Sequence, residues 1–159
     1  MQSENLHDLI IFRVVNKYQS TMNKKLLLLI GFLILIGSAT VVNTSVIDKL
    51  AAAIANAEGA NVEGSRPKRN NNPGNLTLDI TKRAIGRDGI YVIYNTFADG
   101  LDALRKQVDL MFGGSSIYNP SMTIREVAEH YTTTQRDEWA NNVANYLGVT
   151  SNTRLDELT

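Results

Sequence analysis

The pattern of hydrophobic positions from residue 46 onward begins as a helix. Ile47, Leu50 and Ile54 recur at helical spacing on one face, and Gly59 can end the element, which predicts a helix over residues 46–57. The next segment, NVEGSRPKRNNNPGNL, is rich in Gly, Pro and Asn and is typical of a structured loop.

Residues that favour β-structure come next, in two short stretches at 76–80 and 90–94. Gly86 and Gly89 lie between them with Arg and Asp, a composition that favours a tight turn. The sequence therefore predicts a small antiparallel hairpin.

Helical patterns with capping signals come after the hairpin. Asp99 can cap one helix, and Thr123 with Glu126 forms a capping box that opens the next. A further helix begins at Thr134 or Asp137. A helix, a small sheet and then several short helices predict an α+β fold that is mainly α.

An apolar run, LLLLIGFLILIGSATVV, occupies residues 26–42 and contains no charge. As a helix it would span about 26 Å, close to the hydrocarbon core of about 30 Å, so it predicts one transmembrane helix ahead of the globular domain. Four basic residues precede it, which keeps the N-terminus in the cytoplasm and sends the C-terminal domain to the periplasmic side: Arg13, Lys17, Lys24 and Lys25.

A cleaved secretory signal is the alternative, because Met22 can be a true start and residues 37–39 are small enough for a cleavage site. Both interpretations export the part of the chain after the apolar run. The predicted organisation is an N-terminal tail (1–21), a transmembrane segment or signal peptide with a linker (22–45), and one globular domain (46–159).

Composition narrows the classes of function. Sixteen Lys and Arg balance sixteen Asp and Glu, so there is no basic field to attract nucleic acid, and we expect no nucleic-acid partner. The absence of cysteine excludes disulfides, thiolate metal sites and a catalytic thiol. His7 and His130 fall on opposite sides of the apolar run and no HExxH motif occurs, so we expect neither a metal nor another cofactor.

Glu58 lies at the end of the first predicted helix and, at about 3.6 residues per turn, at the edge of its apolar face. A carboxyl there loses part of its hydration, which raises its pKa, as a general acid at a glycosidic oxygen requires. The alternative is a carboxylate that only ends the helix and points to solvent. Glu63 is a rival acid, but its Gly, Ser and Arg neighbours indicate a wetter site.

Asparagines cluster around a Pro-Gly pair in the segment RNNNPGNL. Pro73 and Gly74 fit the central positions of a type II turn. Asn71, Asn72 and Asn75 carry amides that both donate and accept hydrogen bonds, which suits recognition of sugar hydroxyl and acetamido groups. An ordinary surface turn is the alternative.

The segments AEG, RNNNPGNL and YNTFADGLDAL resemble a family of phage-associated cell-wall lysins with a lysozyme-like or lytic-transglycosylase-like domain. The resemblance extends over most of residues 46–149 and includes the capped TI-x-E helix and the LGV segment at Leu147. The widespread soluble transglycosylases differ, because a serine follows their glutamate, where this chain has Gly59, and a GLMQ-like segment occurs later.

The resemblance implies a lysozyme-like domain that cuts the β-1,4 bond between N-acetylmuramic acid and N-acetylglucosamine in peptidoglycan, with Glu58 as the proton donor. A lytic transglycosylase needs only this carboxyl, which then acts as base toward the sugar's own 6-hydroxyl. A hydrolase needs a second carboxylate, for which Asp79 and Asp88 on the predicted hairpin are the candidates.

Five side chains are candidates for binding the sugar: Asn71, Asn72, Asn75, Tyr94 and Tyr131. For the tyrosines, packing in the core is the alternative. We expect a membrane-anchored muralytic enzyme carried by a phage particle, whose partners are peptidoglycan strands, a lipid membrane contacted through residues 26–42, and other virion proteins. The alternatives are a catalytically silent virion protein with the same fold and an enzyme exported late in infection for lysis.

Overall fold

The computed structural model describes residues 44–158; residues 1–43 and 159 lie outside this description. The predicted transmembrane segment, 26–42, and the predicted tail, 1–21, therefore lie outside it as well. Within residues 44–158 no helix is both long enough and apolar enough to cross a membrane.

Helices make up about half of the described chain and far outweigh its one two-stranded antiparallel sheet, so the prediction of an α+β fold that is mainly α is confirmed. The elements in chain order are α2 (Thr44–Ala57), α3 (Arg66–Arg69), β1 (Ala84–Asp88), β2 (Tyr91–Tyr94), α4 (Phe97–Phe112), α5 (Ile124–Tyr131), α6 (Arg136–Leu147) and the 3-10 turn η1 (Leu155–Glu157).

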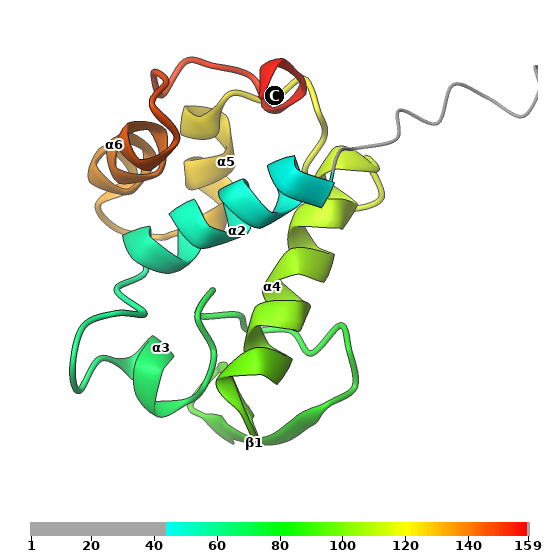
Figure 1. Ribbon diagram of the computed structural model, residues 1–159, viewed down its shortest axis with the longest axis vertical. Coiled ribbons are helices and arrows are strands. Elements are labelled where there is room, and N and C mark those ends of the chain that lie inside the picture. The colour runs from blue at the N-terminus through cyan, green and yellow to red at the C-terminus, as the bar shows by residue number, and fades with distance from the viewer. Residues whose placement is uncertain (1–43, 159) are drawn as a thin grey trace, which may run out of the picture. The chain divides into compact units, whose positions relative to one another are not determined.

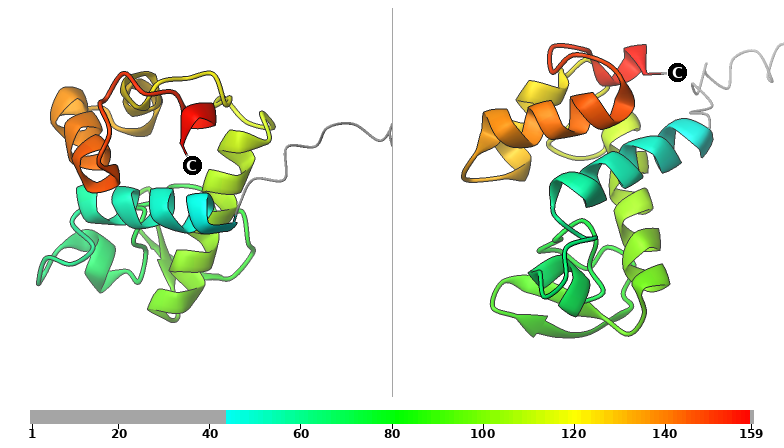
Figure 2. Two further views of the ribbon diagram at one scale, coloured as in Figure 1. Left: turned by 45° about the horizontal axis from the view of Figure 1, so that its top comes forward. Right: turned by 60° about the vertical axis from the view of Figure 1, so that its left-hand side comes forward.

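Helix α2 lies at the centre of the domain, where it packs against α4 and α6, while α5 packs against α6 (Figure 1). Helix α3 and the hairpin lie on the opposite side of α2 from α5 and α6, and α4 extends along both parts (Figure 2). One hydrophobic core runs through these helix contacts. Each of the four helices contributes a fully buried side chain to it: Ile54 from α2, Leu104 from α4, Ile124 from α5 and Val143 from α6.

Several helix ends lie where the capping signals predicted them. Thr123 and Glu126 form the capping box of α5, because the Thr123 side chain accepts from the Glu126 N–H and the Glu126 carboxylate accepts from the Thr123 N–H. Gly59 ends α2 with a φ of 78°, and Gly148 ends α6 with a φ of 72°, a left-handed conformation that glycine adopts without strain. The predicted cap of α4 is wrong by one turn, since Thr96 is the N-cap and Asp99 donates its N–H to the Thr96 hydroxyl.

The hairpin differs from the prediction. Its first strand is Ala84–Asp88 rather than residues 76–80, and Asp88 pairs directly with Tyr91, so the turn lies at 89–90 and not across Gly86. The reason is local: the Asp79 carboxylate accepts hydrogen bonds from the N–H groups of Thr81, Arg83 and Ala84. These bonds fold residues 79–84 into a loop and compete with an extended strand.

Candidate functional site

Glu58 directly follows the last turn of α2, and its own N–H still donates to the Ile54 carbonyl at 2.9 Å. Gly59 then turns the chain away, so the side chain projects from the end of a rigid helix. The indole Nε1–H of Trp139, on α6, donates to Glu58 Oε1 at 2.8 Å. One carboxyl oxygen is therefore held by a helix that packs against α2.

The surroundings of Glu58 favour its protonated form. Burial raises the pKa of Glu58 above its ordinary value and is the largest influence. The hydrogen bond from Trp139, an interaction with the Asn75 side chain and the charge of Arg66 each lower this pKa and offset part of the rise. A half-buried carboxyl with a raised pKa can hold a proton at a pH where exposed carboxylates have lost theirs.

Trp139 is itself fixed by a second aromatic ring. The Tyr131 ring stacks on it with a centroid distance of 4.9 Å and an interplanar angle of 28°. The Tyr131 hydroxyl donates to the Gly74 carbonyl at 2.8 Å, which ties the stack to the Pro-Gly segment. Burial, and then the neighbouring charge of Glu58, raise the pKa of Tyr131 well above its usual range, so its hydroxyl remains a donor.

The Glu58 side chain lines a cleft of about 460 Å³, here called the Glu58 cleft. One wall comes from α6 and the segment before it, and includes Trp139 and Glu138; the other comes from α3, the hairpin turn and the Pro-Gly segment, and includes Arg66, Tyr91 and Asn75. Hydroxyl, amide, carboxyl and guanidinium groups line it beside the three aromatic rings, a combination that suits a polar ligand with flat apolar faces.

A second hollow of about 440 Å³ adjoins the Glu58 cleft. The two share the lining residues Asn75, Thr77 and Tyr131, and the second hollow continues past them to Ile117 and His130. Asn75, Thr77 and Tyr131 therefore lie between the two hollows and face both.

The three candidate asparagines have different positions. Asn72 is fully buried, and its Nδ2 donates to the carbonyls of Leu76 and Val92 while its Oδ1 accepts from the Leu76 N–H. Asn71 donates to the carbonyls of Tyr94 and Asn95. Both thus hold the loop against the sheet, and of the three only Asn75 lines the Glu58 cleft.

The Pro-Gly segment is not the type II turn that the sequence predicts. The left-handed residues are Asn71 and Asn75, each with a φ of 50°, and Gly74 has no positive φ. Gly74 is required for space instead, because a Cβ there would lie 2.6 Å from Leu104 Cδ1 and 3.0 Å from the Tyr131 hydroxyl. The segment is pressed against α4 and α5, which positions Asn75 beside Glu58.

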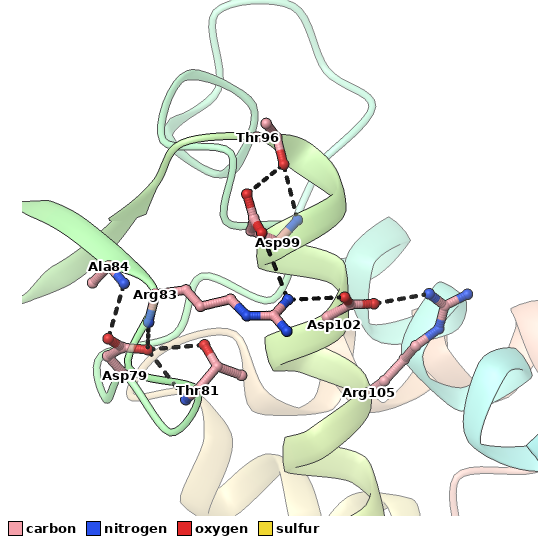
Figure 3. Close-up of polar contacts among 8 residues, drawn as sticks. All are labelled: Asp79, Thr81, Arg83, Ala84, Thr96, Asp99, Asp102 and Arg105. Carbon is pink, nitrogen blue, oxygen red and sulfur yellow. Dashed lines mark hydrogen bonds and ion pairs between the residues drawn. The ribbon is translucent and has the colours of Figure 1, made fainter.

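The two carboxylates proposed for a hydrolase lie elsewhere. Asp79 caps its own loop, and the adjacent Arg83 pairs with Asp99 and Asp102 on α4, as Figure 3 shows. Asp88 accepts from Asn70 at 3.2 Å and pairs with Arg69, which ties the hairpin to α3. Neither lines the Glu58 cleft, where the second carboxylate is Glu138.

Of the two candidate tyrosines and the rival acid Glu63, only one residue lies at the Glu58 cleft. Tyr131 lines the Glu58 cleft, whereas Tyr94 is fully buried in the core, where burial and then the charge of Asp79 raise its pKa. Glu63 is exposed and pairs with Lys68, which lowers its pKa, so it lacks the environment of a general acid. Of the two carboxyls, only Glu58 has the raised pKa that a general acid requires.

Sequence reasoning missed Trp139, Arg66 and Glu138 as parts of the site. Trp139 is the only tryptophan of the chain and falls on the apolar stripe of α6, so the pattern predicts only that it packs in the core. Its contact with Glu58 joins residues 81 positions apart, which no local pattern records. The signal available was its indole N–H, because a buried tryptophan usually finds a hydrogen-bond partner for that group.

Among residues 44–158 there is no cluster of His, Asp or Glu that could hold a metal ion. Comparison of the chain with protein-family models, with curated proteins and with solved structures found no match.

Proposed function

We propose that this chain is a peptidoglycan-cleaving glycosidase with a lysozyme-like domain, and that it acts as a lytic transglycosylase. The observation that carries the proposal is the state of Glu58: a half-buried carboxyl with a raised pKa, held on one oxygen by Trp139 and facing an open polar cleft. The resemblance of AEG, RNNNPGNL and YNTFADGLDAL to phage cell-wall lysins supplies the substrate class.

The proposed reaction needs one carboxyl in two roles. Protonated Glu58 donates its proton to the glycosidic oxygen, and the bond from that oxygen to C1 of N-acetylmuramic acid breaks through an oxocarbenium-like transition state. The Glu58 carboxylate then takes the proton of the sugar's 6-hydroxyl as its oxygen bonds to C1. The products are a new chain end and a 1,6-anhydro sugar, and no water is consumed.

A hydrolase is the competing chemistry for the same site. It would require a carboxylate to activate water or attack C1, and Glu138 is the candidate because it lines the Glu58 cleft while Asp79 and Asp88 do not. The Glu138 Oε2 accepts from Gln135 Nε2 at 3.0 Å, which restrains its position at the start of α6.

The test is mass analysis of the fragments that the full-length chain releases from isolated peptidoglycan. Anhydro-muropeptides are expected from the parent, and Glu58→Gln should reduce their release by at least about a hundredfold. Glu63→Gln is the matched control, since it makes the same change on an exposed carboxylate and should retain activity. Reducing-end products would indicate a hydrolase, and folded parent protein that releases nothing would favour a catalytically silent virion protein.

The location of the enzyme is a separate part of the proposal. We propose that residues 26–42 anchor it in a membrane and that it enters the virion, so that it opens the cell wall only beneath the entering particle. Detection of the chain in purified particles is the expected result. Its absence from particles, together with a free periplasmic form late in infection, would favour the lysis role.

A further inference from the structure

Arg66 lies in the Glu58 cleft at the start of α3, and 42% of its side chain is exposed. Its guanidinium lies over the Tyr91 ring, with Cζ 4.1 Å from the ring centroid. Stacking on an aromatic ring fixes the plane of the guanidinium and leaves its N–H edges available for hydrogen bonds.

The N–H groups of the Arg66 guanidinium make few contacts with the described part of the chain. The Arg66 Nε is 4.0 Å from Asp88 Oδ2, which is too long for a hydrogen bond, and no group within residues 44–158 accepts a hydrogen bond from the guanidinium. Arg69, which pairs with the same Asp88, differs because it also donates to the Gly64 carbonyl. Arg87 likewise donates to the carbonyls of Thr77 and Ile90.

Arg66 also differs in charge from the other residues that line the Glu58 cleft. It is the only cationic side chain among the described residues that line the Glu58 cleft, where the other ionisable carboxyls are Glu58 and Glu138. Glu58 is uncharged in the form that donates a proton, so it does not neutralise Arg66 at that stage. A neutral sugar polymer offers such an arginine only uncharged acceptors, whereas a carboxylate matches its planar donors in two parallel, charge-assisted hydrogen bonds.

We propose that Arg66 forms an anion subsite of the Glu58 cleft, which binds a carboxylate carried by the glycan and selects acidic, peptide-bearing strands over neutral polymers. This rests on the proposed function for the identity of the glycan. The carboxylates of the muramic acid substituents and their peptide stems are the groups of the required chemistry in peptidoglycan. Tyr91 orients the guanidinium, whose Nε lies 4.0 Å from Asp88 Oδ2.

The test measures binding, so that it gives a result whether or not the protein cleaves. The full-length Glu58→Gln chain is titrated with soluble peptidoglycan strands, and with the same strands after their carboxylates have been converted to methylamides. Native strands should bind about tenfold more tightly than amidated ones. Adding Arg66→Gln should remove that tenfold difference by weakening only the binding of native strands.

Arg69→Gln in the same background is the matched control, because it removes one positive charge next to the same Asp88 outside the cleft. It should preserve the preference for native strands. Arg66→Lys provides a second variant that keeps the charge without the planar fork, and it should lose about threefold in binding of native strands. This milder substitution keeps the test decisive if Arg66→Gln does not fold.

The subsite is overturned if the Glu58→Gln chain binds neither kind of strand, if it binds both equally, or if the preference survives loss of Arg66. Failure of the proposed function has a different signature: the unsubstituted chain releases no fragment from peptidoglycan. If the chain prefers native strands through Arg66 but cleaves none, the subsite is supported and the protein is a binding protein.

Discussion

At the scale of single residues, the pKa of Glu58 reflects a balance between burial, which raises it, and three weaker influences that lower it, of which the Trp139 hydrogen bond is the largest. Burial favours the protonated acid, while the Trp139 indole N–H favours the carboxylate that forms after proton transfer. A residue that serves as acid and then as base needs both forms to be accessible. In the proposed reaction Trp139 is thus a positioning residue, which would hold one oxygen of Glu58 in both steps.

Trp139→Phe tests this role. The substitution removes the N–H donor but leaves an aromatic ring to stack on Tyr131, so activity at the optimum should fall about tenfold through lost orientation. Loss of a hydrogen bond that lowers the pKa of Glu58 should raise that pKa further. The protonated acid then persists to higher pH, so the alkaline limb of the pH–rate profile should shift to higher pH. If that limb does not shift, Trp139 has only a packing role.

Glu58 should also reduce the stability of the domain near neutral pH. Its folded-state pKa is raised above the ordinary 4.5, so the folded protein holds a proton that the unfolded chain releases as pH rises through 4.5. The stability contributed by the protonated form is complete below that pH and is lost as pH rises to the folded pKa. Glu58→Gln should therefore have a higher denaturation midpoint than the parent at pH 7 and an equal one near pH 4; a variant less stable than the parent at pH 7 would contradict this.

At the scale of elements, the asparagine segment and α4 fit together through Gly100. A Cβ at Gly100 would lie 1.8 Å from the Asn71 carbonyl oxygen and 2.9 Å from Pro73 Cδ. The first turn of α4 therefore tolerates no side chain there. Asn72, with its bonds to Leu76 and Val92, holds the other side of the segment. These contacts fix the segment that carries Asn75 to the cleft.

Gly100→Ala should destabilise the domain by about 2 kcal/mol, because the helix and the segment must separate to admit the methyl group. Gly86→Ala is the matched control, since its nearest contact would be Ile93 Cδ1 at an ordinary 3.8 Å, and its effect should stay within about 0.5 kcal/mol. Chemical denaturation measures both. Equal stability of the two variants would show that the segment can shift without cost.

At the scale of the whole domain, the Tyr131 hydroxyl joins the C-terminal end of α5 to the asparagine segment. Its partner, the Gly74 carbonyl, is 57 positions away in the chain. The Tyr131 ring also stacks on Trp139, which holds Glu58. One side chain therefore contacts both the asparagine segment and the residue that positions Glu58.

Tyr131→Phe keeps the stacked ring and removes only the donor to Gly74. The carbonyl is left without this partner, so the free energy of unfolding should fall by about 1 kcal/mol. The pH–rate profile should change less than it does in Trp139→Phe, because the bond to Glu58 remains. Thermal and chemical denaturation, read beside activity, separate the two roles, and a loss of activity equal to that of Trp139→Phe would show that the Gly74 contact is what positions the acid.

Features that arise within a few residues of one another could be predicted from the amino-acid sequence alone. The capping box at Thr123 and Glu126, the glycine that ends α2 and the location of Glu58 after that helix are local interactions, and the pattern recorded them correctly. The antiparallel hairpin and its second strand are predicted correctly, but the predicted first strand is wrong. The competing bonds of Asp79, although local, involve a side chain whose choice of partners the pattern does not specify.

The groups that surround Glu58 were set by tertiary packing. Packing of α6 on α2 brings Trp139 to a carboxyl 81 positions away, and the pressed asparagine segment buries Asn72 while exposing Asn75 to the cleft. The same packing leaves both hairpin carboxylates outside the cleft and brings Arg66 and Glu138 into it. Burial and contacts between distant segments determine these outcomes, because the pKa of an acid depends on everything packed around it.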